Sequence, residues 1–75
     1  MDERVRAALV SCATKEASNP RARYGLSALP LFLEAVDRVE ELVNKGATLE
    51  SAINRCFNDR LRDKMLKAAG VPVRP

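Results

Sequence analysis

The sequence predicts a small all-α domain, with a short N-terminal helix before a tight antiparallel hairpin of two long amphipathic helices. Three observations support this fold class. The chain has 75 residues, a length typical of one domain. Apolar residues recur at spacings of three and four, the period of an amphipathic helix. Proline and glycine separate the helical segments. We therefore expect one domain, with an N-terminal helix and linker over 1–19, a helical hairpin over 27–70 and a tail over 71–75.

The first helix is expected from Asp2 to about Ala17. Asp2 can cap its beginning, and Pro20 ends it because proline disfavours helix in the preceding residue. Its apolar stripe consists of Val5, Ala8, Leu9, Cys12 and Ala13. Because this stripe is small and rich in alanine, the first helix buries little surface.

The second helix is expected from about Ser27, a suitable N-cap, to Asn44. Pro30 falls in the first turn, where its missing N–H costs nothing, and Gly46 suits the left-handed residue after a helix. The apolar stripe comprises Phe32, Val36, Val39 and Val43. The opposite face offers i,i+4 ion pairs worth ~0.2–0.5 kcal/mol each, namely Glu34 with Arg38 and Glu41 with Lys45.

The third helix is expected as one segment from its cap at Thr48 to Gly70. Its apolar stripe comprises Leu49, Ala52, Ile53, Cys56 and Phe57, continued by Leu61, Met65 and Ala68. The later members advance by four, so the stripe rotates around the helix. The hairpin therefore leaves Leu61, Met65 and Leu66 uncovered. Either the first helix or a second copy of the chain covers this edge, and we expect a homodimer.

Composition argues against an enzyme, a metal site or a cofactor. The chain has no histidine, and its two cysteines, Cys12 and Cys56, lie far apart, which removes the usual nucleophilic triads and zinc sites. Both cysteines fall on apolar stripes and are expected to be buried thiols. No apolar run approaches the roughly 20 residues that span a membrane, and the N-terminus lacks a secretion signal. A cytoplasmic location is expected.

Two basic features suggest a small accessory nucleic-acid-binding protein, within a net charge of +3. The connection after the first helix carries Arg21 and Arg23 beside Tyr24 and no acid. The third helix carries cations on two faces, which could lie along a phosphate backbone. Arg60, Lys64 and Lys67 share one face, and Arg55 and Arg62 share another. Alternatively, this helix docks on the acidic face of the second helix.

A second functional class is a helical protein–protein interaction module or inhibitor that makes no nucleic-acid contact. Such an interface uses apolar and aromatic anchors with arginine at its rim. The candidate anchors are Tyr24, Phe57, Leu61 and Met65.

The residue pattern from 21 to 53 is also compatible with an alternative fold. Residues 21–27 alternate polar and apolar, Leu29 and Pro30 open a helix, and residues 46–53 link into the next. This pattern resembles the ribbon-helix-helix family, an intertwined dimer with an N-terminal strand. The resemblance implies that Arg21, Arg23 and Ser27 read the major groove. The chain departs from the family because Gly25 weakens a strand, a helical segment precedes the ribbon, and the last helix runs on to about residue 69.

Overall fold

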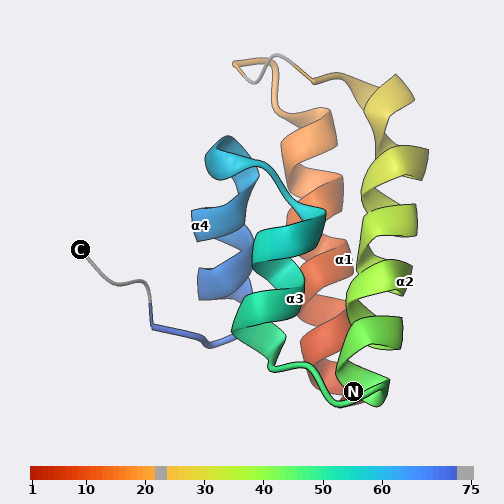
Figure 1. Cartoon of the computed structure of the whole chain (residues 1–75). Coiled ribbons are helices and arrows are strands. Elements are labelled where there is room, and N and C mark those ends of the chain that lie inside the picture. The colour runs from red at the N-terminus through yellow and green to blue at the C-terminus, as the bar shows by residue number, and fades with distance from the viewer. Residues whose placement is uncertain (22–23, 73–75) are drawn as a thin grey trace.

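The computed structural model describes residues 1–21 and 24–72 of the chain. This part is all-α, as the sequence predicts, and its elements are α1 (Glu3–Ser18), the 3-10 turn η1 (Leu26–Ala28), α2 (Leu29–Asn44), α3 (Leu49–Cys56) and α4 (Asp59–Ala68) (Figure 1). No strand occurs in the described residues, and 26–28 form the 3-10 turn instead. The ribbon-helix-helix alternative, which requires a strand there, is therefore wrong.

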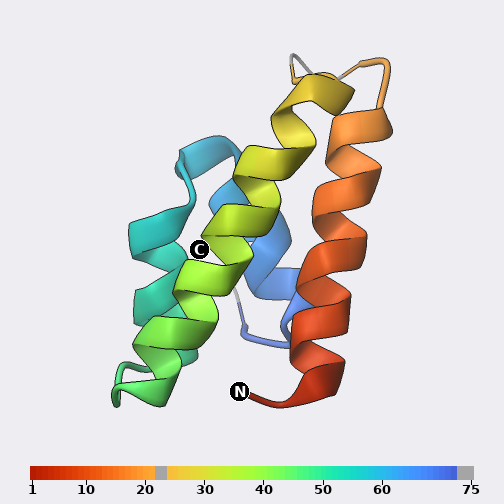
Figure 2. The same ribbon diagram turned by 90° about the vertical axis from the view of Figure 1, so that its right-hand side faces the viewer.

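The four helices lie at the corners of a square. Each packs on two neighbours: α1 on α2 and α4, and α3 on α2 and α4. Figure 2 shows α1 and α2 side by side, connected at one end by the segment that leads into η1. The α1–α4 seam and the α2–α3 seam consequently lie on opposite sides of the molecule. No helix of the described part is long and apolar enough to cross a membrane.

Helix caps follow the sequence at two of three positions. The Asp2 carboxylate accepts a hydrogen bond from the Arg4 N–H at 2.8 Å, and the Thr48 hydroxyl accepts one from the Ser51 N–H at 3.1 Å. Ser27, in contrast, lies within η1 rather than at the N-cap of α2, and Ala28 takes that position without a side-chain bond. A preceding 3-10 turn therefore replaces the expected cap.

The expected third helix is in fact two helices. Phe57 adopts an extended conformation with φ −122° and ψ 143°. Asn58 then begins α4, because its side-chain oxygen accepts hydrogen bonds from the Arg60 and Leu61 N–H groups, both at 3.2 Å. The break lets α4 return alongside α3 (Figure 1). The rotating apolar stripe is accommodated by this turn rather than by one long helix. The expected third helix is therefore wrong in its length, while its first part, α3, packs on α2 across a short connection.

The core lies between all four helices and includes the edge that the sequence leaves uncovered. Leu61, Met65 and Leu66 are 2%, 0% and 5% exposed, because α1 packs directly on α4. The other buried apolar residues are Leu9, Ala13, Ala17, Phe32, Val36, Val39, Ala52, Ile53 and Phe57. A single protomer therefore covers this edge, and the reason for expecting a homodimer there is removed.

The acidic face of α2 is paired with α1 and not with α4. Arg6 of α1 forms ion pairs with Asp37 at 2.6 Å and with Glu40 at 3.2 Å. The hydrogen bond to Asp37, helped by the charge of Glu40, raises the pKa of Arg6. α4 makes no contact with α2, so the cations of α4 do not dock on the acidic face of α2 within the chain. Of the expected third helix, only α3 packs on α2.

Candidate nucleic-acid interface

The outward face of α4 carries three cations. Arg60, Lys64 and Lys67 are spaced at i, i+4 and i+7, which places them on one side of a helix. The opposite side, with Leu61 and Met65, is held in the core. That packing fixes the rotation of α4, so all three cations are exposed to solvent.

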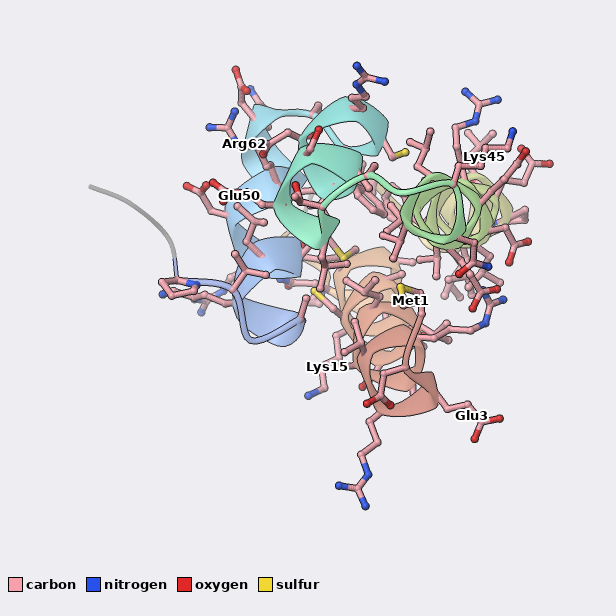
Figure 3. The ribbon with its side chains drawn as sticks, turned by 60° about the horizontal axis from the view of Figure 1, so that its bottom comes forward. Met1, Glu3, Lys15, Lys45, Glu50 and Arg62 are labelled. Carbon is pink, nitrogen blue, oxygen red and sulfur yellow. The ribbon has the colours of Figure 1, made fainter. Side chains whose placement is uncertain are left out.

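A groove of about 430 Å³ runs along the α1–α4 seam beside these cations. Lys64 and Lys67 line it from α4, and Lys15 lines it from α1. Figure 3 shows Lys15 extending from α1 toward the α4 side of the molecule, away from Lys45 at the C-terminal end of α2. The other lining residues are Ala8, Ser11, Cys12, Glu16 and Ala68. We refer to the four side chains Lys15, Arg60, Lys64 and Lys67 as the α1–α4 cationic face.

One lysine of this face is held by a nearly buried carboxylate. The Lys64 Nζ donates a hydrogen bond to Glu16 Oε1 at 2.7 Å, and the Glu16 side chain is 11% exposed while that of Lys64 is 53% exposed. This hydrogen bond raises the pKa of Lys64. Lys15, Arg60 and Lys67 have no ion-pair partner among the described residues. Three of the four cations are therefore available to an external anion.

The structure separates the remaining predicted cations from this face. Arg62 forms ion pairs with Asp59 at 3.3 Å and Asp63 at 3.7 Å, so its charge is neutralised within α4. Arg55 lies on the α2–α3 seam, on the opposite side of the molecule. Arg21 is exposed after the end of α1, and Arg23 lies outside the described residues.

The residues predicted as apolar anchors do not form an exposed surface that could bind a partner. Phe57, Leu61 and Met65 belong to the core, so the expectation that they bind a partner is not compatible with the folded protomer. Tyr24 is half-buried, and its ring meets that of Phe32 edge-on at a centroid distance of 5.1 Å. The Tyr24 hydroxyl is buried without a hydrogen-bond partner. Tyr24 therefore packs against the core beside Phe32.

Sequence reasoning missed Lys15 and Glu16. Glu16 continues the apolar stripe of the first helix, because it follows Cys12 by four and Ala13 by three. A carboxylate at such a position indicates a buried charge that needs a cation. That signal predicts a partner but does not identify Lys64, which is 48 positions away.

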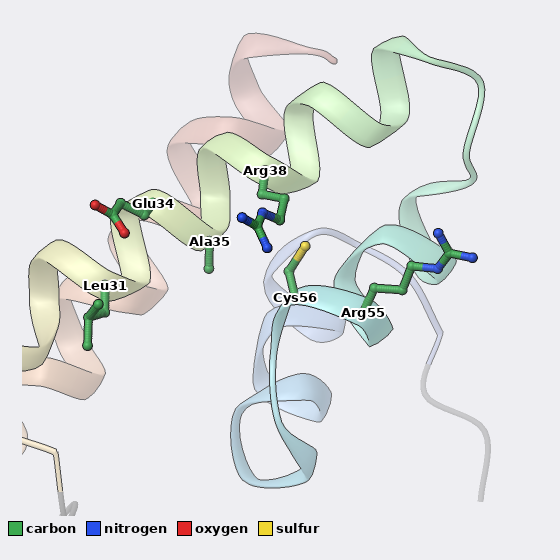
Figure 4. Close-up of a pocket in the computed structure, with 6 residues that line it drawn as sticks. All are labelled: Leu31, Glu34, Ala35, Arg38, Arg55 and Cys56. Atoms are coloured by element: carbon green, nitrogen blue, oxygen red, sulfur yellow. The ribbon is translucent and has the colours of Figure 1, made fainter.

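A second groove, of about 230 Å³, lies on the α2–α3 seam. Its lining residues are Leu31, Glu34, Ala35, Arg38, Arg55 and Cys56 (Figure 4). The expected pair between Glu34 and Arg38 is absent within the described residues. Figure 4 shows the Arg38 side chain directed toward Cys56 and the Glu34 side chain directed away. The other expected pair on α2 forms, with Lys45 Nζ at 3.0 Å from Glu41 Oε1.

The two cysteines line different grooves and do not pair. Both Cys12 and Cys56 are free thiols. Each is half-buried rather than buried, and burial is the main cause that raises the pKa of both thiols. Across residues 1–21 and 24–72, no group of three or more histidine, cysteine, aspartate or glutamate side chains could hold a metal.

Comparison of the chain with protein families, with curated proteins and with solved structures finds no match. The function proposed for this chain is supported by the charges, burial and geometry of its own residues.

Proposed function

We propose that this protein binds the phosphate backbone of nucleic acid through the α1–α4 cationic face. The observation that carries the proposal is the position of its unpaired cations. Arg60 and Lys67 share one side of α4 with Lys64, and Lys15 joins them from α1 across a groove. A row of this kind can displace the counterions condensed on a nucleic acid, which is the main source of backbone affinity.

The distribution of charge over the molecule supports binding through the side that carries α4. α4 carries four cations and two acids, a net charge of +2, whereas α2 carries one cation and four acids, a net charge of −3. The two helices occupy diagonal corners of the bundle. A polyanion is therefore attracted to the α4 side and repelled from the α2 side, which orients the protein during encounter.

The chemistry of the face favours binding without sequence recognition. Three of its four members are lysines, which contact phosphates as flexible point charges, and phosphate contacts carry no direct sequence information. The aromatic residues Tyr24, Phe32 and Phe57 pack in or against the core, so the face has no aromatic platform for stacking unpaired bases. We therefore infer that the ligand is a duplex backbone, bound with a dissociation constant on the order of 10⁻⁴–10⁻⁶ M at physiological salt.

The proposal is tested by the salt dependence of binding. Fluorescence anisotropy with a labelled 20-base-pair duplex, between 25 and 200 mM KCl, measures the slope of log K against log salt. Contact with three or four phosphates gives a slope of about −2.7 to −3.6, at about −0.9 per phosphate. The variant Lys67→Ala should weaken binding and reduce the magnitude of the slope by about 1.

Lys45→Ala is the matched control. It makes the same chemical change and the same change in net charge, but at the C-cap of α2, where Lys45 is exposed and paired with Glu41. It should leave the slope unchanged. Equal effects of the two substitutions would show that net charge alone governs binding, and the proposed face would then be wrong. Absence of binding at 25 mM KCl would also overturn the proposal.

A further inference from the structure

Two large apolar side chains are exposed in η1 and the first turn of α2. Leu26 and Leu31 are 65% and 66% exposed, and they are the large apolar side chains left exposed among the described residues. Leu31 also lines the α2–α3 groove with Ala35 and Cys56. This groove lies on the side opposite the α1–α4 cationic face. Its apolar wall therefore has no role in the proposed nucleic-acid contact.

The rim of the same groove carries charges of both signs that form no ion pair with the residues that the structure describes. Glu34 lies on one side, and Arg38 and Arg55 lie near Cys56 (Figure 4). None of the three forms an ion pair in the described part of the chain. A two-fold interface brings the same surface of two copies together, so a groove with both signs offers each charge an opposite charge on the other copy.

We infer that the α2–α3 groove is the contact surface between two copies of this chain. In a two-fold dimer, Leu31 of each copy covers apolar groove surface of the other. Glu34 of each copy then faces the arginines of its partner. A purely acidic partner would satisfy the arginines but would leave Glu34 facing like charge. The net charge of only +3 per chain opposes association of two copies weakly.

The small size of the α2–α3 groove indicates a weak dimer that dissociates on dilution. Interfaces of standard size bury about 800 Å² per partner, and the protomer exposes 5163 Å² in total. The groove is lined by Leu31, Glu34, Ala35, Arg38, Arg55 and Cys56, fewer residues than the roughly 20–30 that each partner contributes to such an interface. Sedimentation equilibrium of the full chain between 5 and 500 µM, with a reductant present, should therefore show a mass rising with concentration from 8.3 kDa toward twice that value.

Leu31→Glu tests the apolar contact. Because Leu31 is exposed, the fold should persist, and far-ultraviolet circular dichroism verifies this. The charge placed in the groove should raise the dimer dissociation constant by at least ~10-fold, which corresponds to about 1.4 kcal/mol. Ala7→Glu adds the same charge at an exposed position on α1 and should leave the dissociation constant unchanged.

Glu34→Arg distinguishes a second copy from a different partner. It removes a carboxylate from each groove and places three arginines there, so the dimer should weaken. A groove that serves an acidic segment of another protein would show no change in self-association. A constant mass of 8.3 kDa over the whole concentration range would overturn the inference. So would a dimer that survives both Leu31→Glu and Glu34→Arg.

Discussion

Glu16 shows how a single residue ties the cationic face to the fold. Its carboxylate is nearly buried at the α1–α4 seam and accepts a hydrogen bond from Lys64 at 2.7 Å. A buried carboxylate without a cation is costly, so the pair fixes where Lys64 lies and helps to hold α4 against α1. Lys64 thus has a structural role, while Lys15, Arg60 and Lys67 carry the free charge.

The sign of the Lys64 pKa shift predicts how stability depends on pH. The hydrogen bond that Lys64 donates to Glu16 raises the pKa of Lys64 in the folded state above the value of about 10.4 in an unfolded chain. The pair therefore stabilises the fold fully below pH ~10.4, and this stabilisation is lost as the pH rises through the folded pKa. Urea denaturation at pH 7, 9.5 and 11 measures the effect.

Lys64→Met should lower the free energy of unfolding at pH 7 and should reduce the further loss between pH 9.5 and 11. The double variant Glu16→Gln/Lys64→Met should be more stable than Lys64→Met, because it no longer leaves a carboxylate without its partner. If Lys64→Met and the wild type lose the same stability in alkali, the pair does not contribute as described.

Local residue patterns were predictable, and long-range pairs were not. Asp2 and Thr48 were identified as caps because capping depends on the residue and its next few neighbours. The partners of Arg6 and Glu16 lie more than 30 positions away, and only the packing of the helices brings them together.

At the scale of elements, apolar periodicity located helical segments but did not locate the break between α3 and α4. The period of the stripe is nearly continuous from Leu49 to Met65, and neither glycine nor proline interrupts it. The break occurs at Phe57 and Asn58 instead. Asn58 is a strong N-cap residue, and Asp59 follows it in the first turn, where an acid is favourable. A capping signal inside an apolar stripe therefore indicated the break.

Asn58→Ala should destabilise the protein because it removes the acceptor for the N–H groups of Arg60 and Leu61. Loss of an N-cap costs about 0.5–2 kcal/mol, and about 1 kcal/mol lowers Tm by roughly 4–8 °C in a domain of this size. Asn58→Asp keeps the acceptor and should melt close to the wild type. Differential scanning calorimetry measures both, and an alanine variant as stable as the wild type would contradict the capping role.

At the scale of the whole molecule, the all-α class followed from the sequence, but the neighbours of each helix did not. Periodicity shows which side of a helix is buried and not what it is buried against. The alanine-rich stripe of α1 was expected to bury little surface, and either α1 or a second copy of the chain was left to cover the edge. Ala13 and Ala17 are nonetheless buried, and their small side chains let helices approach closely. α1 therefore covers the edge of α4, and the exposed leucines lie in η1 and the first turn of α2.

The opposite placement of the two grooves gives the last prediction. If the chain dimerises through the α2–α3 groove, the two α1–α4 cationic faces point away from each other. One dimer can then hold two duplexes at once. Duplexes labelled separately with a donor and an acceptor dye should show energy transfer when mixed with wild-type protein at a concentration that favours the dimer.

Leu31→Gln separates this bridging from simple binding. It removes an exposed apolar contact at unchanged net charge, on the side remote from the cationic face. It should bind a single duplex with the same salt slope as the wild type but should lose the energy transfer between duplexes, because bridging needs two linked faces. Lys67→Ala should instead weaken binding and bridging together. Energy transfer that persists in Leu31→Gln at concentrations where this variant is monomeric would show that one protomer contacts two duplexes, which a single cationic face does not allow.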